Sequence, residues 1–158
     1  MNPSLTTGLL LAAALLAGQA AASQPDFNGD GLADLLWHNT VNGKNQIWLA
    51  ARAGKRLPVA PMTDLDWFVA GSGDFNGDAI SDILWRHRST GDNTIWLAAN
   101  SETVQAVSPL AGQEWAVAAI ADFDGDGSDD ILWHNTSNGA STIWLAADSS
   151  NPQAVDSA

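Results

Sequence analysis

The sequence of 158 residues contains no cysteine and no tyrosine, and only six of its residues are lysine or arginine. Without cysteine, no disulfide can stabilise small structural units, so another interaction has to hold them. The 18 acidic residues give the chain a formal charge of −12. So negative a protein repels nucleic acid and anionic membranes. The composition therefore excludes disulfide-rich scaffolds and disfavours nucleic-acid-binding proteins.

Motifs of common catalytic sites are also absent. The sequence has no Gly-x-Ser-x-Gly elbow, no His-Glu-x-x-His pair and no phosphate-binding loop. After the first residues, no window shows the sustained 3.6-residue apolar period of an amphipathic helix. We therefore expect a protein that is not an enzyme and that is built from strands.

Long apolar runs are scarce too. The run at residues 9–17 is too short to span a bilayer, and Ala20, Ala21 and Ala22 offer a small-residue cleavage site before Ser23. Residues 1–22 are predicted to be a signal peptide, with an uncleaved anchor helix as the alternative, since no lysine or arginine precedes the run. The mature chain is then expected to be secreted, on the cell surface or periplasmic, with no membrane insertion after cleavage.

What the sequence has in abundance is repetition. The segment Asp-Phe-Asn-Gly-Asp at residues 26–30 recurs at 74–78 and, with Asp in place of Asn, at 122–126, each time 48 residues further on. All eight tryptophans fall on three repeat positions, and these are 37, 85 and 133, then 48, 96 and 144, then 67 and 115. The chain therefore divides after residues 1–22 into repeat 1 (23–73), repeat 2 (74–121) and repeat 3 (122–158).

Each repeat has the pattern of short strands. In the second repeat we expect strands at 67–70, 83–85, 94–97 and 103–107, where 67–70 precedes the acidic segment. Turns are predicted at Asn42-Gly43, Thr90-Gly91 and Asn138-Gly139. Four short antiparallel strands are the content of one β-propeller blade.

The two ends of the repeated region differ from its middle. Repeat 1 lacks a first strand of its own, and residues 67–73 form the first strand of the next blade. Repeat 3 ends after a brief fourth strand near 153–155. We predict an all-β fold of propeller-type blades, about 2.75 in number, that is either incomplete or completed by further copies in a homo-oligomer.

Ten of the 18 acidic residues lie at equivalent positions of three loops. Oxygen-bearing side chains occupy positions 1, 3, 5 and 9, counted from the first aspartate of each loop, and glycines at positions 4 and 6 permit sharp bends. Ca²⁺ prefers six to eight oxygen ligands, and a carbonyl at position 7 would add one. The predicted ligands of up to three calcium ions are Asp26, Asn28, Asp30, Leu32, Asp34, Asp74, Asn76, Asp78, Ile80, Asp82, Asp122, Asp124, Asp126, Ser128 and Asp130.

These loops allow two other interpretations. An EF-hand requires a bidentate glutamate at position 12, where this chain has Trp37, Trp85 and Trp133. Plain turns between strands also favour Asp, Asn and Gly, but three copies of one ligand spacing favour a metal site.

A second set of candidates follows the loops. His38, Arg86 and His134 occupy one repeat position, directly after Trp37, Trp85 and Trp133. These six residues could bind a ligand at the blade ends. The alternative is structural, since repeated tryptophans often pack one blade on the next.

The segment Asp-Phe-Asn-Gly-Asp-Gly-x-x-Asp-hydrophobic-Leu-Trp, preceded by residues 69–73, resembles the FG-GAP/VCBS repeats of bacterial exported proteins. It is also similar to the calcium-binding blades of integrin α-chain propellers and of certain fungal lectins. The resemblance covers about residues 26–150 and implies that the acidic loop joins the first two strands of each blade. Two departures stand out: Ala79 replaces the position-6 glycine, and residues 118–121 lack the glycines of 69–73.

The resemblance implies a non-catalytic, calcium-binding module for extracellular binding or adhesion, with an extracellular protein or carbohydrate as partner. Two alternatives stay open. One is a lectin-like carbohydrate-binding propeller, and the other is a scaffold segment of a larger exported enzyme.

Overall fold

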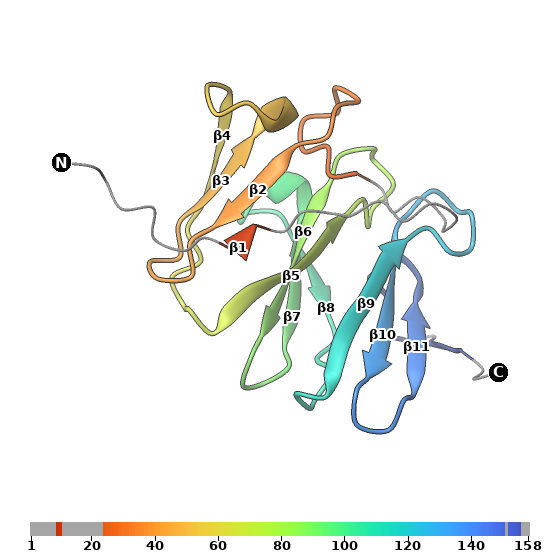
Figure 1. Ribbon diagram of the computed structural model, residues 1–158. Helices are drawn as coiled ribbons and strands as arrows, with labels where there is room; N and C mark the ends of the chain where they lie inside the picture. Colours follow the sequence, from red (N-terminus) through yellow and green to blue (C-terminus); the bar gives the residue numbers. More distant parts are fainter. Residues whose placement is uncertain (1–8, 11–23, 151, 156–158) are drawn as a thin grey trace.

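The computed structural model describes residues 9–10, 24–150 and 152–155. These residues form three antiparallel sheets of four strands each, and in every sheet the strands lie side by side in chain order (Figure 1). We call the sheets blades 1, 2 and 3. The prediction of an all-β fold made of propeller-type blades is confirmed. Among the described residues, no helix is long and apolar enough to cross a membrane.

The strands follow the 48-residue repeat. Blade 1 contains β1 (Leu9–Leu10), β2 (Leu35–His38), β3 (Asn45–Trp48) and β4 (Arg56–Val59). Blade 2 contains β5 (Trp67–Gly73), β6 (Asp82–His87), β7 (Asn93–Trp96) and β8 (Val104–Val107). Blade 3 contains β9 (Trp115–Ala121), β10 (Asp130–Asn135), β11 (Ser141–Trp144) and β12 (Gln153–Ala154).

The strand β1 occupies the place that β5 and β9 have in the other blades. Leu9 pairs with His38 and Leu10 with Trp37. The repeat pattern predicted no first strand for this blade, and the open edge of β2 instead pairs with two residues of the apolar N-terminal run, since an exposed edge offers free backbone donors and acceptors. The rest of the predicted signal peptide lies outside the described residues.

A short 3-10 turn follows the third strand of each blade, at Leu49–Ala51, Leu97–Ala99 and Leu145–Ala147. The prediction that Leu97 continues the third strand is therefore wrong, because β7 ends at Trp96. The middle residue of each turn has a left-handed backbone, with φ between 45° and 48°. Alanine is strained in this region, so something in each blade has to hold the turn.

The core consists of two apolar clusters, one at each junction between blades. At the first junction, Phe27 and Ile47 of blade 1 meet Ile83 and Trp85 of blade 2. At the second junction, the equivalent residues of blades 2 and 3 meet in the same way, and Trp133 takes the place of Trp85. The recurrence of tryptophan at this position is therefore explained by the packing of one blade on the next.

Glycine in β5 allows blade 3 to come close. A Cβ atom at Gly71 would lie 2.2 Å from the side chain of Ile120, and one at Gly73 would lie 2.6 Å from the carboxylate of Asp129. In β9 the equivalent positions are Ala119 and Ala121, and no further blade of the described chain packs against them. This accounts for the missing glycines in repeat 3.

Candidate metal centre

The three acidic loops lie at equivalent places in the three blades. Residues 74–81 join β5 to β6, residues 122–129 join β9 to β10, and residues 26–34 lead into β2. Figure 1 shows them along one edge of the molecule. The resemblance implied this position between the first and second strands.

The aspartate at position 1 organises each loop. The Oδ1 atoms of Asp26, Asp74 and Asp122 accept hydrogen bonds from the backbone N–H of position 5 at 3.2, 3.1 and 3.2 Å. Their Oδ2 atoms accept from the N–H of position 6 at 2.7, 2.7 and 3.1 Å. The loop backbone thus wraps around this carboxylate, as the alternating spacing requires.

Positions 3 and 5 turn inward by the same means. The side-chain oxygen at position 3 accepts from the backbone N–H of position 5 at 3.1 Å in all three loops. The Oδ1 atom at position 5 accepts from the N–H of position 7 at 2.9, 2.8 and 2.7 Å. These bonds direct the oxygens of positions 1, 3 and 5 toward the inside of one tight loop.

The aspartate at position 9 has a second role, which sequence reasoning missed. Asp34, Asp82 and Asp130 are at most 3% exposed. Their Oδ2 atoms accept from the backbone N–H of the position-2 phenylalanine at 2.9, 3.0 and 2.8 Å. Their Oδ1 atoms each accept at 2.8 Å from the middle alanine of the 3-10 turn. Each of these carboxylates therefore joins its loop to the strained turn of the same blade.

The sequence carries a signal for this link. The triplet Leu-Ala-Ala recurs at the 48-residue interval, 15 residues after each position-9 aspartate. Two left-handed alanines in succession are unusual, and the buried carboxylate is the partner that holds the first of them.

The electrostatics of the loops favour a bound cation. The pKa of Asp82 is raised to about 6. Burial is the largest cause and the charges of Asp78 and Asp74 add to it, whereas the two backbone hydrogen bonds that Asp82 accepts oppose the rise. Burial likewise raises the pKa of Asp130. In contrast, the backbone N–H of Gly125 leads the hydrogen bonds that lower the pKa of Asp122. Carboxylates that are buried and crowded in this way are stabilised by a nearby positive charge.

The donor atoms fit calcium. Asp122, Asp124 and Asp130 each offer a carboxylate oxygen, and these oxygens lie within 4.8 Å of one another. The carbonyl groups of the position-7 residues Leu32, Ile80 and Ser128 accept no hydrogen bond in the described part of the chain. Every donor is an oxygen, which is the ligand that Ca²⁺ and other hard cations prefer.

The backbone at position 6 is left-handed in all three loops, as the glycine pattern predicted. The φ angles are 78° at Gly31, 65° at Ala79 and 95° at Gly127. Only blade 2 has a side chain at this strained position, so its loop is expected to be the least stable of the three.

Ala79→Gly should therefore raise the free energy of unfolding by about 1 kcal/mol, because glycine adopts this backbone without strain. Chemical denaturation in the presence of calcium measures the effect. Gly127→Ala is the matched converse, since no atom within 4 Å would crowd its Cβ, and it should lower the stability by a similar amount. Equal stability of the wild-type protein and both variants would contradict the assigned strain.

The residue at position 8 of the second and third loops joins each of them to the loop before it. Sequence reasoning missed this contact too. The Oγ atom of Ser81 accepts a hydrogen bond from the backbone N–H of Asp26 at 2.8 Å, and the N–H of Ser81 donates to the carbonyl of Asp26 at 2.8 Å. Asp129 makes the same pair of bonds to Asp74, at 2.8 and 2.6 Å. We call these two pairs the loop clamps.

The second set of sequence candidates lies inside the blades. Trp85 and Trp133 are fully buried, and the buried Arg86 donates to Gly91, Asn93 and two further carbonyl groups. The indole rings of Trp85 and Trp133 therefore have no open face for a ligand in this structure.

The remaining candidates are less uniform. The buried His38 is hydrogen-bonded to Asn45 at 2.7 Å, and the half-buried His134 lies 3.0 Å from the Oγ atom of Ser141. Trp37 is also half-buried. A role in ligand binding stays a prediction for Trp37 and His134.

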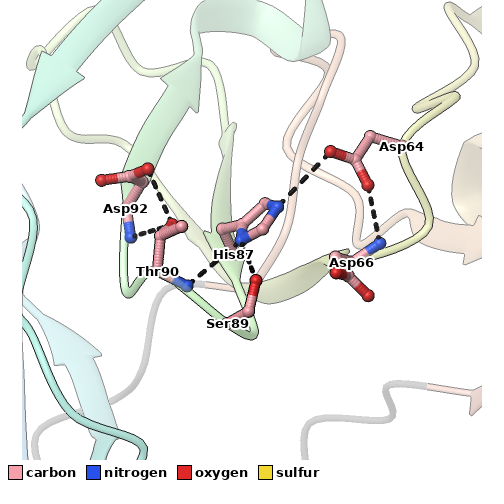
Figure 2. A network of polar contacts seen from close by, with 6 residues as sticks. All are labelled: Asp64, Asp66, His87, Ser89, Thr90 and Asp92. Atoms are coloured by element: carbon pink, nitrogen blue, oxygen red, sulfur yellow. Dashed lines mark hydrogen bonds and ion pairs between the residues drawn. The ribbon is translucent and has the colours of Figure 1, made fainter.

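A further group of metal-type ligands lies at the other end of β6. The donor atoms of Asp64, Asp66 and His87 are within 4.8 Å of one another, and Figure 2 shows the imidazole between Asp64 and the turn that follows β6. The Nδ1 atom of His87 accepts the backbone N–H of Thr90 at 3.3 Å. The Nε2 atom therefore carries the proton and donates to Asp64 at 3.4 Å. A metal at Nε2 would leave the ring proton on Nδ1 and so break the bond that Nδ1 accepts from Thr90. We therefore assign this group to the turn.

The repeat supports this assignment. In the other blades, Asn39 and Asn135 occupy the position of His87, and their Oδ1 atoms accept the N–H groups two and three residues further on at 2.9 to 3.2 Å. His87→Asn should therefore leave the free energy of unfolding within about 0.5 kcal/mol of the wild type, whereas His87→Ala should lower it by about 1 kcal/mol. Equal losses in both variants, measured by denaturation, would show that the contact with Asp64 matters more than the turn.

Comparison with known proteins agrees with the geometry. The FG-GAP-like repeat family matches residues 26–85 and 74–133. The two matches together span more than half of the chain, and each runs from one acidic loop to the second-strand tryptophan of the next repeat. The protein therefore belongs to the FG-GAP-like repeat family. Searches of curated proteins and of solved structures found no significant match.

Proposed function

We propose that this protein is a non-catalytic binding module, acting outside the cytoplasm, whose blades are stabilised by calcium. The observation that carries the proposal is the convergence of position-1, position-3 and position-9 carboxylates in the third loop, with oxygens within 4.8 Å of one another. The same hydrogen-bond pattern repeats in the first two loops, which supports up to three equivalent sites.

The side-chain oxygens at positions 1, 3, 5 and 9, together with the position-7 carbonyl, would hold the ion. Bound calcium would neutralise the like charges that crowd each loop, and it would fix the connection between the first two strands of the blade. The role is structural, and it supplies the stabilisation that disulfides provide in other exported domains.

Calorimetric titration of the whole chain with calcium tests the proposal. We expect binding of about three ions per chain, as for other oxygen-ligand loops. Asp30→Asn, Asp78→Asn and Asp126→Asn should each remove or weaken one site, because each exposed side chain would lose its charge but keep an oxygen. No measurable binding at millimolar calcium would exclude the metal assignment.

The two outer faces of the row of blades, on blade 3 and on blade 1, offer a surface for a partner. Phe123 of blade 3 is 41% exposed, whereas the equivalent Phe75 of blade 2 is 1% exposed because blade 3 covers it. On the opposite side of the three blades, Trp37 is half-buried, whereas the equivalent Trp85 and Trp133 are fully buried.

These two faces are complementary to each other. Phe123, Leu132 and Ile143 repeat the residues with which blade 2 meets blade 3, and Leu35, Trp37 and Trp48 repeat those with which blade 3 meets blade 2. We infer that a second copy of the chain docks head to tail, with its blade 1 on blade 3 of the first. Such heterologous contacts produce closed rings or open chains.

Sedimentation at micromolar concentration should then give a mass of two or more chains. Phe123→Asp should shift the protein to a monomer, because a charge in the apolar face opposes burial. Val104→Asp is the control, since Val104 is 55% exposed on the outer strand of blade 2. A compact wild-type monomer would contradict the head-to-tail contact.

A further inference from the structure

A pocket of about 240 Å³ lies between blades 2 and 3. Its walls come from β5, β6 and β9 and from the segments just beyond β6 and before β9. It opens to solvent at Arg88, Gln113 and Ala116, which are exposed. The pocket belongs neither to the acidic loops nor to the exposed blade faces described above.

Arg86 lines the pocket with a fixed positive charge. Its guanidinium donates to Gly91, Asn93 and Leu110 at 2.9 to 3.1 Å, and it lies over the ring of Trp133, 5.0 Å from the centroid. These partners are neutral carbonyl groups and a neutral ring, so no carboxylate cancels the charge of Arg86.

Arg88 supplies a second positive charge at the mouth. Its guanidinium carbon lies 4.9 Å from the centroid of Phe68, and within residues 24–150 it makes no ion pair. No aspartate or glutamate lines the pocket. A site with two arginines and no acid is unusual in a chain with 18 acidic and six basic residues.

The repeat shows that these residues depart from the blade pattern. Blades 1 and 3 have Thr40 and Thr136 at the position of Arg88, and blade 3 has Ala116 at that of Phe68. Since the other blades fold without them, the arginine and the phenylalanine are not required by the blade itself. Arg88 lies in the surface connection that follows β6, and binding residues are found disproportionately on such connections.

The acidic loops do not compete for these cations. Phe68 lies near the start of β5, and the second loop begins after its end at Gly73. Five residues of extended strand separate the two by about 17 Å. This distance is about twice the Debye length of about 8 Å in physiological salt, so the charges of the loops are largely screened at the pocket. An anion in the pocket is therefore attracted by the nearby arginines and only weakly repelled by the loops.

We propose that this pocket binds a small ligand in which one six-membered ring carries a carboxylate. The carboxylate pairs with the free guanidinium of Arg88, and the ring packs on the half-buried Trp115 between blades. The volume is below the roughly 300 to 1,000 Å³ of sites for drug-sized ligands, which limits the ligand to one ring. Gln113 at the rim offers an amide to a ring substituent.

The ring acid could be an aromatic acid or a sugar acid, and titration of the whole chain in calcium distinguishes the two. Benzoate represents the aromatic acids, with benzyl alcohol as its neutral control. Glucuronate represents the sugar acids, with glucose as its neutral control. We expect one of the two acids to bind with a Kd of about 1 mM or tighter, and its neutral partner to bind at least about ten-fold more weakly.

Arg88→Thr is the test variant, because threonine is the natural residue in the other two blades, and it should weaken the acid about ten-fold. Arg52→Thr, at an exposed arginine of blade 1, controls for net charge and should bind as the wild type does. Equal affinity of the wild type and Arg88→Thr would overturn the proposal. So would the failure of both acids to bind at about 10 mM.

Discussion

Removal of calcium by a chelator is expected to lower the melting temperature by about 15 °C or more. An ion at 100 times its Kd stabilises the folded state by about 2.7 kcal/mol, so three sites contribute about 8 kcal/mol. In a domain of this size, each kcal/mol shifts the melting temperature by about 2 to 4 °C. The crowded carboxylates of each loop make the ion-free form still less favourable.

Differential scanning calorimetry in calcium and in excess chelator measures this shift, and magnesium at the same ionic strength is the control. Mg²⁺ requires a near-ideal octahedron and gives up its water reluctantly, so it should restore little of the lost stability. A melting temperature that is the same in calcium and in chelator would exclude a structural role for the ion in these loops.

The second large effect is expected at the buried aspartate of blade 2. Asp82→Ala should lower the free energy of unfolding by about 2 to 4 kcal/mol even in chelator, because two backbone N–H groups lose their acceptor. These are the N–H groups of Phe75 and of Ala98, at 3.0 and 2.8 Å. Release of the strained turn at Ala98 adds to the loss, since its left-handed backbone would no longer be held.

Asp78→Asn is the matched control in the same loop. Asp78 is exposed, and an amide oxygen can keep the bond that its Oδ1 accepts from Ile80. This variant should bind calcium more weakly but stay within about 0.5 kcal/mol of the wild type in chelator. Denaturation in chelator therefore separates the two roles, and equal losses in both variants would refute the division between a fold-holding and a metal-holding carboxylate.

The sequence was sufficient to predict the features that depend on the repeat alone. A fixed interval of 48 residues relates the acidic loops and the tryptophans. This repeat was enough to predict the strand order within each blade and the left-handed backbone at position 6. The function of position 9 was seen only in part. Its contact with the 3-10 turn joins residues 16 apart, such as Asp82 and Ala98, and no local propensity indicates it.

The polar contacts between blades were beyond prediction for a related reason. The loop clamps join residues 55 apart, and the pocket forms only when β5 and β9 meet. The strand β1 is a further case, since its pairing depends on the open edge of β2 and not on a strand pattern in residues 9–10. The features that sequence patterns did not show are therefore contacts between residues that are far apart in the chain.

The loop clamps make the three acidic loops a chain with nearest-neighbour contacts only. Ser81 reaches the first loop from the second, and Asp129 reaches the second from the third. An ion that orders the third loop therefore also orders the backbone of Asp74, to which the second ion would bind. Occupancy would spread stepwise along the row, as in a one-dimensional array, and the middle loop, with two clamped neighbours and the strained Ala79, would respond most steeply to calcium concentration.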